Sequence, residues 1–329
     1  MIRRLIKLVS AVLGIVLILC LLGIAVVWNN RPGMDLVRAH ELPPAGADWP
    51  AGEVRAVWFG VSTVAISDGE HGILIDPFLS RPGLVDLALN RPLAVDFGAV
   101  QAALSRAGIR RLDAMFAGHA HYDHIMDVGA VHRLTGAHFY GSASAVNVAI
   151  GHGMPAELTR ELPDELPLRI GAFTITQIPS RHAGATGGRP LGEITRPLPV
   201  PSTAQDYRQG GTVSILVEHP SGSVLHHGSA GVQPGALHGY PADAVLLGVA
   251  LIDDLGPYLN ETVDRVGATR VIPVHWDDFT RPLTQPISPM PAVVNLPQLF
   301  EQLRTGRKDL SVETLPPGVP VTLFPAPGE

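Results

Sequence analysis

Four side chains in one short run are suited to holding a metal ion. The run is His119-Ala120-His121-Tyr122-Asp123-His124, which places three imidazoles and one carboxylate within six residues. In an extended backbone, residues two apart point the same way, so His119 and His121 can converge on one cation. Asp123 and His124 begin a helix that turns off that axis, so they can address a second cation nearby. Imidazole and carboxylate ligands suit zinc, and also manganese or iron.

Two further histidines follow runs of β-forming residues and are candidates for the remaining ligands. A catalytic zinc site needs a third protein ligand. The apolar run 175–178 leads to His182, and the run Val271–Val274 leads directly to His275. Because the first cluster also follows an apolar strand, over Leu112–Ala117, we expect the three stretches to end at one edge of the fold. The sequence therefore indicates a metal site assembled from three distant segments.

Short β-rich runs and helical stretches alternate in two successive halves of the body. In the first half, glycines separate three strands that predict an antiparallel meander over Val54–Phe59, Thr63–Ser67 and Gly72–Ile75. Apolar spacing predicts helices over Phe97–Ala107 and from Asp123 through Leu134. The second half has predicted strands and helices over Leu168–Ile178 (two strands), Gly211–Glu218, Val224–His227, Ala244–Val249, Asp253–Val266 (helix), Val271–Val274 and Leu296–Arg304 (helix). This alternation indicates an α/β fold in which helices cover a pair of sheets.

Two segments rich in glycine or proline interrupt the pattern. Residues 185–210 and 281–291 show little periodicity, and the first is long for a loop inside a compact domain. Such loops are commonly functional lids or disordered segments. We expect residues 185–210 to be disordered or to form the lid or groove that selects the substrate.

An unbroken apolar stretch runs from Leu8 to Trp28 near the N-terminus. It is long enough to span a bilayer core, which takes about 20 helical residues. Arg3, Arg4 and Lys7 precede it. The positive-inside bias therefore places the N-terminus in the cytoplasm and the rest of the chain on the other face.

These features divide the chain into a transmembrane signal anchor over residues 1–30, a stiff, extended, proline-rich linker over 31–52 and one globular domain over 53–329. The predicted location is the inner (cytoplasmic) membrane, crossed once, with the domain periplasmic or otherwise extracytoplasmic. Two alternatives are weaker. A cleaved signal peptide has a shorter apolar region, of about 7–15 residues. A lipoprotein modified at Cys20 would need a small residue where Leu19 stands.

Composition excludes several other classes of protein. Hydrophobic residues make up 46% of the chain and charged residues 16%, which indicates a folded body. The net charge is -6 and basic residues cluster only at the N-terminus. Nucleic-acid binding needs clustered cations to neutralise phosphates, so we expect no nucleic-acid partner. Cys20 is the only cysteine, so an intrachain disulfide and a cysteine zinc site in the body are both excluded.

Five pieces of the sequence together resemble a known family. They are Ile75-Asp76-Pro77, Gly118-His119-Ala120-His121-Tyr122-Asp123-His124, Ser180-Arg181-His182, Gly228-Ser229-Ala230-Gly231 and Ile272-Pro273-Val274-His275-Trp276. Over roughly Val54 to Phe279 the chain resembles the metallo-β-lactamase-fold hydrolases. It is most similar to the branch that contains the N-acyl phosphatidylethanolamine phospholipase D and the ascorbate-phosphate lactonase. The resemblance implies an αββα sandwich with the metal site along one edge. It also implies two ligand sets, namely His119, His121 and His182 for one metal and Asp123, His124 and His275 for a second.

One position departs from the pattern of that family. The family has Gly-Asp where this chain has Gly228-Ser229, and that aspartate bridges the two metals. Serine is neutral and offers one oxygen, so the second metal should bind more weakly, or the site should work with one metal. His226 or His227 are candidates to replace the missing ligand. His227 lies two residues before Ser229, so it faces the same way in an extended strand.

The predicted function is hydrolysis by a water molecule activated by one or two zinc ions, with manganese or iron as alternatives. Bound zinc lowers the pKa of water from about 15.7 to around 7 and polarises the oxygen under attack. Asp123 is the predicted catalytic residue, because it can orient the hydroxide, or accept its proton if the second metal is absent. The predicted substrate is a small-molecule or lipid-like ester, phosphodiester or lactone. The lipid is favoured by the membrane anchor and by analogy to a phospholipase.

Two functions from other classes compete with this prediction. One is a non-catalytic metal-binding envelope protein that lost turnover together with the bridging aspartate. The six retained ligands weigh against it. The other is redox chemistry at a di-iron site, which would require acidic ligands in place of several of the histidines and a flavin partner. The oligomeric state is left open.

Overall fold

Two seven-stranded sheets form the centre of the molecule. The structure is a computed structural model, and it describes residues 2–29, 31, 33–184, 189–291 and 293–328. The first sheet has the order β16 (Val321–Phe324), β1 (Val54–Trp58), β2 (Val64–Ser67), β3 (Gly72–Ile75), β5 (Ala114–Phe116), β6 (His138–Gly141) and β7 (Thr159–Glu161). The second has the order β15 (Ser311–Val312), β14 (Arg270–Val274), β13 (Ala244–Gly248), β12 (Gly222–His227), β11 (Val213–His219), β9 (Phe173–Pro179) and β8 (Leu168–Ile170).

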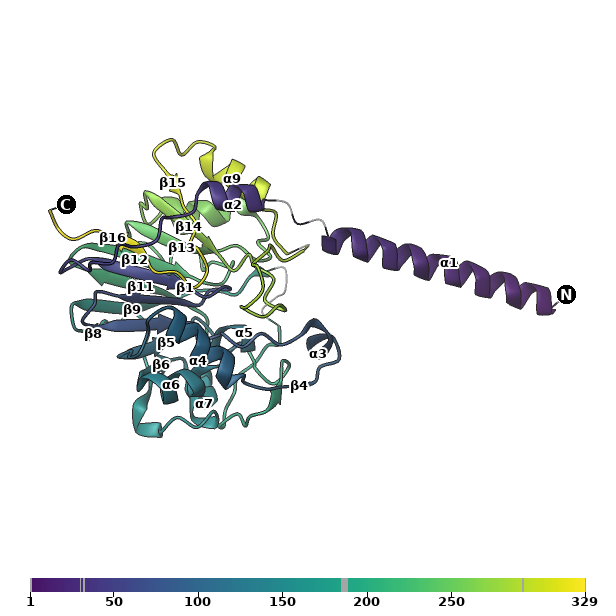
Figure 1. The fold of residues 1–329 in the computed structure, drawn as a ribbon, viewed down its shortest axis with the longest axis horizontal. Coiled ribbons are helices and arrows are strands. Elements are labelled where there is room, and N and C mark those ends of the chain that lie inside the picture. The colour runs from purple at the N-terminus through teal and green to yellow at the C-terminus, as the bar shows by residue number, and fades with distance from the viewer. Residues whose placement is uncertain (1, 30, 32, 185–188, 292, 329) are drawn as a thin grey trace.

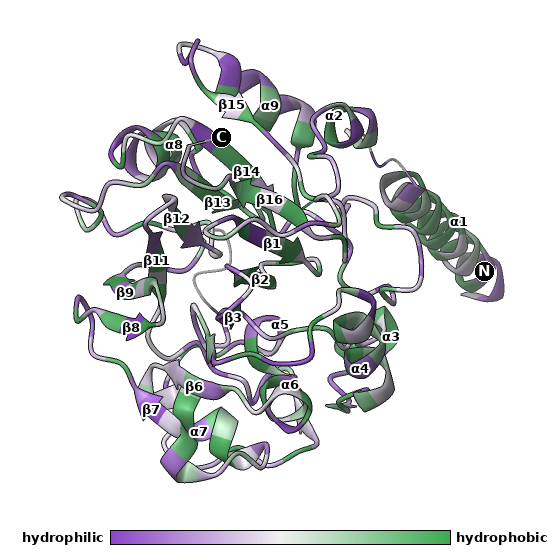
Figure 2. Ribbon diagram, turned by 60° about the vertical axis from the view of Figure 1, so that its left-hand side comes forward, coloured by the Kyte–Doolittle hydropathy of each residue, from purple (hydrophilic) through white to green (hydrophobic). Residues whose placement is uncertain are grey.

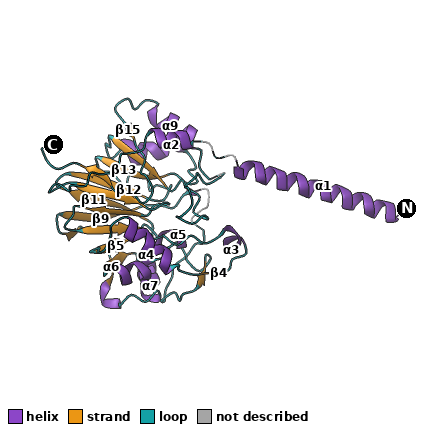
Figure 3. Ribbon diagram, in the orientation of Figure 1, coloured by secondary structure: helices purple, strands orange, loops and turns teal. Residues whose placement is uncertain are grey.

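Helices cover the outer face of each sheet, so the layers run helix, sheet, sheet, helix (Figure 3). The helices beside the first sheet are α4 (Phe97–Arg106), α5 (Tyr122–Ile125), α6 (Val128–Thr135) and α7 (Ala143–Gly151). The second sheet is accompanied by α2 (Met34–Ala39), α8 (Leu255–Leu259), a π-helical turn (Asn260–Asp264) and α9 (Leu296–Arg304). The predicted αββα sandwich is confirmed.

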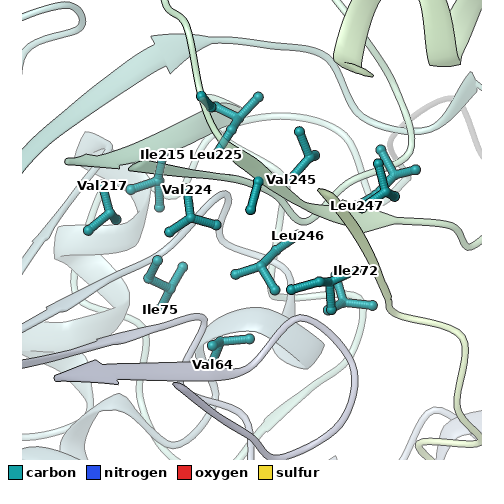
Figure 4. Packing of buried hydrophobic residues seen from close by; sticks show 14 of the residues in the cluster. Val64, Ile75, Ile215, Val217, Val224, Leu225, Val245, Leu246, Leu247 and Ile272 are labelled. Atoms are coloured by element: carbon teal, nitrogen blue, oxygen red, sulfur yellow. The ribbon is translucent and has the colours of Figure 1, made fainter. Parts of the chain in front are cut away.

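The side chains of the first sheet alternate between its two faces, and each face contributes to a separate hydrophobic core. Val64 and Ile75 face Val224 and Leu246 of the other sheet (Figure 4). The intervening residues, such as Leu74, pack on the opposite face against the helices. Successive side chains of a strand point to opposite faces, and here both faces are buried, so the strands read as continuous apolar runs. Truncation of such a fully buried leucine to alanine typically costs about 2–5 kcal/mol of stability.

Most of the predicted elements are present, and the differences have identifiable causes. The meander of β1, β2 and β3 is antiparallel, as predicted. The helix predicted from Asp123 through Leu134 is instead two helices, α5 and α6, with Asp127 between them. The Asp127 carboxylate accepts hydrogen bonds from the backbone N–H groups of Leu79 and Ser80, both at 2.6 Å. These hydrogen bonds hold the junction between α5 and α6 against the loop that follows β3.

The prediction of an extended linker over residues 31–52 is wrong. Residues 34–39 form α2, which lies against α9 (Figure 1). Val37 is buried in the core, and the Thr314 hydroxyl donates to its carbonyl oxygen at 2.6 Å. The prolines of the segment indicated a stiff spacer, but its apolar residues bury themselves on the body instead.

The glycine- and proline-rich segment predicted as a lid or a disordered stretch is partly outside the described residues, at 185–188. Residues 189–210 cross α7, where Asn147 Nδ2 donates to the Ile194 carbonyl oxygen at 2.8 Å. Farther along, β10 (Ser202–Thr203) pairs with β4 (Pro92–Leu93), which follows the short helix α3 (Leu84–Ala88). The described part of this segment is therefore attached to the body through backbone and side-chain hydrogen bonds.

The N-terminal helix α1 (Ile2–Asn29) projects away from the body (Figure 1). Its segment Ile6–Val26 has a mean hydropathy of 3.0 over 21 residues, and none of it is buried. Figure 2 shows that it is hydrophobic along most of its length. Among the described residues it is the one helix long and apolar enough to cross a bilayer.

Candidate metal centre

Three loops that follow strands bring the predicted ligands together. The loop after β5 and the start of α5 carry the His119–His124 run, His182 follows β9, and His275 follows β14. The structure gathers these side chains into two groups, and within each group the potential ligand atoms lie within 4.8 Å of one another. The first group is His119, His121 and His182, and the second group is Asp123, His124 and His275.

The first group consists of three imidazoles. His119 Nε2 lies 3.0 Å from His121 Nδ1, and the ring of His182 is centred 4.8 Å from each of the other two rings. Burial, and then the nearby His124 and His121, hold the pKa of His119 well below its usual value. Burial and the neighbouring His121 lower the pKa of His182 to about 4. Neutral imidazoles whose lone pairs converge are poor proton acceptors and good ligands for a divalent cation, so this donor set fits zinc.

The second group combines a carboxylate with two imidazoles. Asp123 Oδ2 lies 3.4 Å from His275 Nε2, and the rings of His124 and His275 are 5.4 Å apart. Burial raises the pKa of Asp123, but His124 and His275 outweigh that effect and hold the pKa well below its usual value. Asp123 is therefore an anion, and this set of one carboxylate and two imidazoles also fits a divalent cation.

Asp76 is a functional residue to which sequence reasoning assigned no role. Its Oδ2 lies 2.7 Å from His124 Nδ1, and its Oδ1 accepts a hydrogen bond from the Gly118 N–H at 2.7 Å. A carboxylate that accepts from one ring nitrogen of a histidine leaves the other nitrogen available as a ligand. Asp76 therefore orients His124 and the start of the ligand loop. The available signal was the Asp76-Pro77 pair at the end of a buried strand.

The backbone is strained where it presents His275. This residue has a φ of 60°, a left-handed backbone conformation that residues other than glycine seldom adopt. Its N–H donates to the Val61 carbonyl oxygen at 2.7 Å, while the Val61 N–H donates to Asp277 Oδ1 at 2.6 Å. The buried Arg81 pairs with the same Asp277 carboxylate at 2.9 Å. This chain of contacts fixes the turn that aims the His275 ring at the second group.

Ser229 lies beside the groups and belongs to neither. Its hydroxyl accepts a hydrogen bond from the Ala183 N–H at 3.1 Å, next to His182. His226 and His227 lie outside both groups, and each ring uses one nitrogen for another contact, so their suggested compensation stays a prediction. His226 Nε2 lies 2.7 Å from the Ser62 carbonyl oxygen, and His227 Nδ1 lies 2.7 Å from the hydroxyl of a serine on β11, Ser214.

A cavity of about 190 Å³ opens over both groups. Apart from the candidate ligands, its walls are mainly apolar, with Leu251, Phe279 and Val293 on one side. Arg189 and Pro190 line it as well, so the described part of the 185–210 segment borders the cavity, as expected of a lid or groove. Five of the six candidate ligands, all except His119, therefore line one cavity with mainly apolar walls.

Comparison with known proteins agrees with this fold. The model of the β-lactamase superfamily domain matches residues 71–276. A metal-dependent hydrolase from Myxococcus xanthus is 25% identical over 266 residues, which cover 78% of this chain and 81% of that protein. Another from Methanopyrus kandleri is 26% identical and covers 69% of this chain and 85% of its own length.

Solved structures show the same architecture at low sequence identity. A metallo hydrolase from Ignicoccus hospitalis has a TM-score of 0.53 and 18% identity, covering 82% of this chain and 97% of its own. An isothiocyanate hydrolase from Delia radicum gut bacteria has a TM-score of 0.54 and 15% identity, covering 82% and 100%. The fold and the His/Asp clusters together define a metal-dependent hydrolase. The chain belongs to the β-lactamase superfamily, whose domain matches more than half of it.

Proposed function

We propose that this protein hydrolyses an ester, phosphodiester or lactone with water activated by zinc. In this proposal the first group holds one ion and the second group holds another. The observation that carries the proposal is the pair of three-ligand groups beneath one cavity. When bound, zinc supplies Lewis acidity and lowers the pKa of water to around 7.

The residues of the chain prepare the site for that chemistry. Neutral His119 and His182 offer lone pairs without a proton to displace. Asp123 is ionised, so its carboxylate can bind the second ion and orient a water molecule, and it can accept the proton of that water only where the second ion is absent. Asp76 fixes the ring of His124 from behind. The apolar walls of the cavity keep other water away from the reacting group, which strengthens each electrostatic contact within it.

The substrate we favour is lipid-like. The walls formed by Leu251, Phe279 and Val293 suit an alkyl or acyl portion, and the guanidinium of Arg189 suits a negative group such as a phosphodiester. The apolar helix α1 would place the enzyme in a membrane. We further propose that α1 is an uncleaved anchor in the cytoplasmic membrane and that the body, including α2, lies on the extracytoplasmic side. Arg3, Arg4 and Lys7 support this orientation.

The test is a metal analysis of the purified full chain combined with assays on ester, lactone and phosphodiester probes. We expect near-stoichiometric zinc in the first group and hydrolysis of at least one probe class. Substitution of His119→Ala should remove both, whereas the exposed His238→Ala should change neither. Unchanged turnover in a metal-free His119→Ala protein would overturn the proposal.

A further inference from the structure

The short helix α3 exposes an unusual set of apolar side chains. Leu84, Val85 and the adjoining Leu89 are 46%, 60% and 61% exposed, and none of the helix's own residues is buried. The polar side chain of the helix, Asp86, is turned to Arg91, with which it forms an ion pair at 3.2 Å. Leu87 packs against the core, whereas Leu84, Val85 and Leu89 face solvent, so the helix has apolar side chains on its exposed side as well.

Among the described residues, Arg31 connects the end of α1 to the body. Arg31 Nε donates to the carbonyl oxygen of Trp28, the last aromatic residue of α1, at 3.0 Å. Its Nη1 donates to Asp278 Oδ2 at 2.8 Å and to Ser288 Oγ at 2.6 Å. The Arg31–Asp278 pair is largely buried, at 15% and 1% side-chain exposure. The point at which α1 leaves the body is therefore fixed on the loop that follows His275.

That loop also forms a wall of the metal cavity. Phe279 directly follows Asp278 and lines the cavity, and its ring lies 5.9 Å from that of His275. In Figure 1, α1 leaves the body on the side that carries α3, and Figure 2 shows α3 on that side again after rotation. The candidate membrane helix and the exposed apolar helix thus share one side of the molecule, and the loop that Arg31 contacts there leads to the metal cavity.

We propose that α3 is a membrane-contact surface that rests the body on the bilayer from which α1 emerges. Leu84, Val85 and Leu89 enter the boundary between the headgroups and the acyl chains of the phospholipids, as the apolar face of an interfacial helix does. With α1 fixed by Arg31 and α3 in contact with lipid, the body has two attachments and its metal cavity lies toward the membrane. The inference rests on α1 crossing the bilayer, and it deepens the proposed function by giving a lipid-like substrate a direct route from the membrane.

The test places a fluorescent label at position 85 of the full chain. Val85→Cys is made together with Cys20→Ser, labelled, and incorporated into phosphatidylcholine–phosphatidylglycerol nanodiscs that contain a lipid spin-labelled near the headgroup. The control is Leu166→Cys, because Leu166 is also apolar and 54% exposed but precedes β8 on the side of the body away from α1 (Figure 1). We expect the label at 85 to lose most of its fluorescence and the label at 166 to keep it, with aqueous iodide giving the opposite order.

A second variant separates contact from mere proximity. Leu84→Asp with Leu89→Asp should restore the fluorescence of the label at 85, because both positions are exposed and the change leaves the core intact. Equal lipid quenching at 85 and 166 would overturn the docking surface. Protection from iodide without lipid quenching would also overturn it, because a second copy or another protein would then cover α3. Zinc content measured on the same samples distinguishes a failure of docking from a failure of the proposed metal site.

Discussion

The two ligand groups of the metal centre differ in how they are supported. The first group is three imidazoles, and burial together with neighbouring histidines lowers the pKa of His119 and His182. The second includes a carboxylate and is held from outside by Asp76, yet it has Ser229 where a bridging aspartate is expected from the resemblance. A neutral hydroxyl adds little attraction for a cation. We therefore expect the first group to bind its ion strongly, whereas ion binding by the second group depends on support from neighbouring residues.

The largest effect should come from the first group. His119→Ala removes one of three ligands, so hydrolysis should fall by more than the about 10–100-fold that changes in supporting residues typically cause. Zinc bound to the purified variant, measured by elemental analysis, should fall with it. If the second group alone sustained full turnover, the ranking of the two groups would be reversed.

Substitution of the supporting carboxylate should weaken the second group selectively. In Asp76→Asn, an amide N–H would face His124 Nδ1 and favour the tautomer whose other nitrogen carries a proton. That nitrogen would then lack the lone pair needed for a ligand, so we expect a loss of about 10–100-fold in affinity for the second ion. Titration with zinc, followed by calorimetry, separates the two binding steps. Equal weakening of both steps would show that Asp76 acts on the whole loop.

Restoring a carboxylate at position 229 should strengthen the second group. Ser229→Asp should raise the affinity for the second ion by about tenfold, which corresponds to about 1.4 kcal/mol. Ser229→Ala is the matched control, because it removes the hydroxyl that accepts from the Ala183 N–H without adding charge. An unchanged second binding step in Ser229→Asp would mean that this position does not border the ion.

The smallest effect is expected for Asp113 and His71, an Asp–His pair outside the metal centre. This pair shows what such a contact contributes to stability when it does not position a ligand. Burial raises the pKa of Asp113, but the Gly72 N–H, His71 and Arg111 outweigh it and hold the pKa below its usual value. Its stabilising contribution is therefore present above the unfolded pKa, about 3.9, and is lost as the pH falls through the folded pKa. Asp113→Asn should lower the free energy of unfolding at pH 7 by less than about 1 kcal/mol, because the pair is partly exposed.

Urea unfolding of the Asp113→Asn variant at pH 7 and at pH 2–3 measures this difference, which should disappear at the lower pH. Zinc binding and hydrolysis should be unchanged. A loss of zinc in this variant would remove the distinction between a stabilising Asp–His pair and one that positions a ligand.

The local part of the site could be predicted from the sequence, because its geometry follows from neighbouring residues. Within the His119–His124 run the ligand side chains point in two directions. This follows from the local backbone and does not depend on the rest of the fold. His182 and His275 could be located because each follows a strand, and strands of one sandwich end at a common edge. The meander of β1 to β3 was predictable for the same local reason.

Features that depend on distant contacts could not be predicted. The role of Asp76 requires β3 and β5 to be adjacent, which places its carboxylate against His124. The contacts of His226 and His227 could not be predicted either, because strand periodicity gives a face but not the partners that occupy it, here Ser62 and Ser214. Similarly, α2 was interpreted as linker because its burial depends on α9, far along the chain.

The central claim is that the two groups hold divalent cations, and anomalous X-ray diffraction at the zinc absorption edge tests it most directly. Crystals of the full chain grown with zinc should show an anomalous peak enclosed by His119, His121 and His182. A second peak at Asp123, His124 and His275 should be weaker and should strengthen in Ser229→Asp crystals. A folded, hydrolytically active protein without a peak at either group would contradict the account.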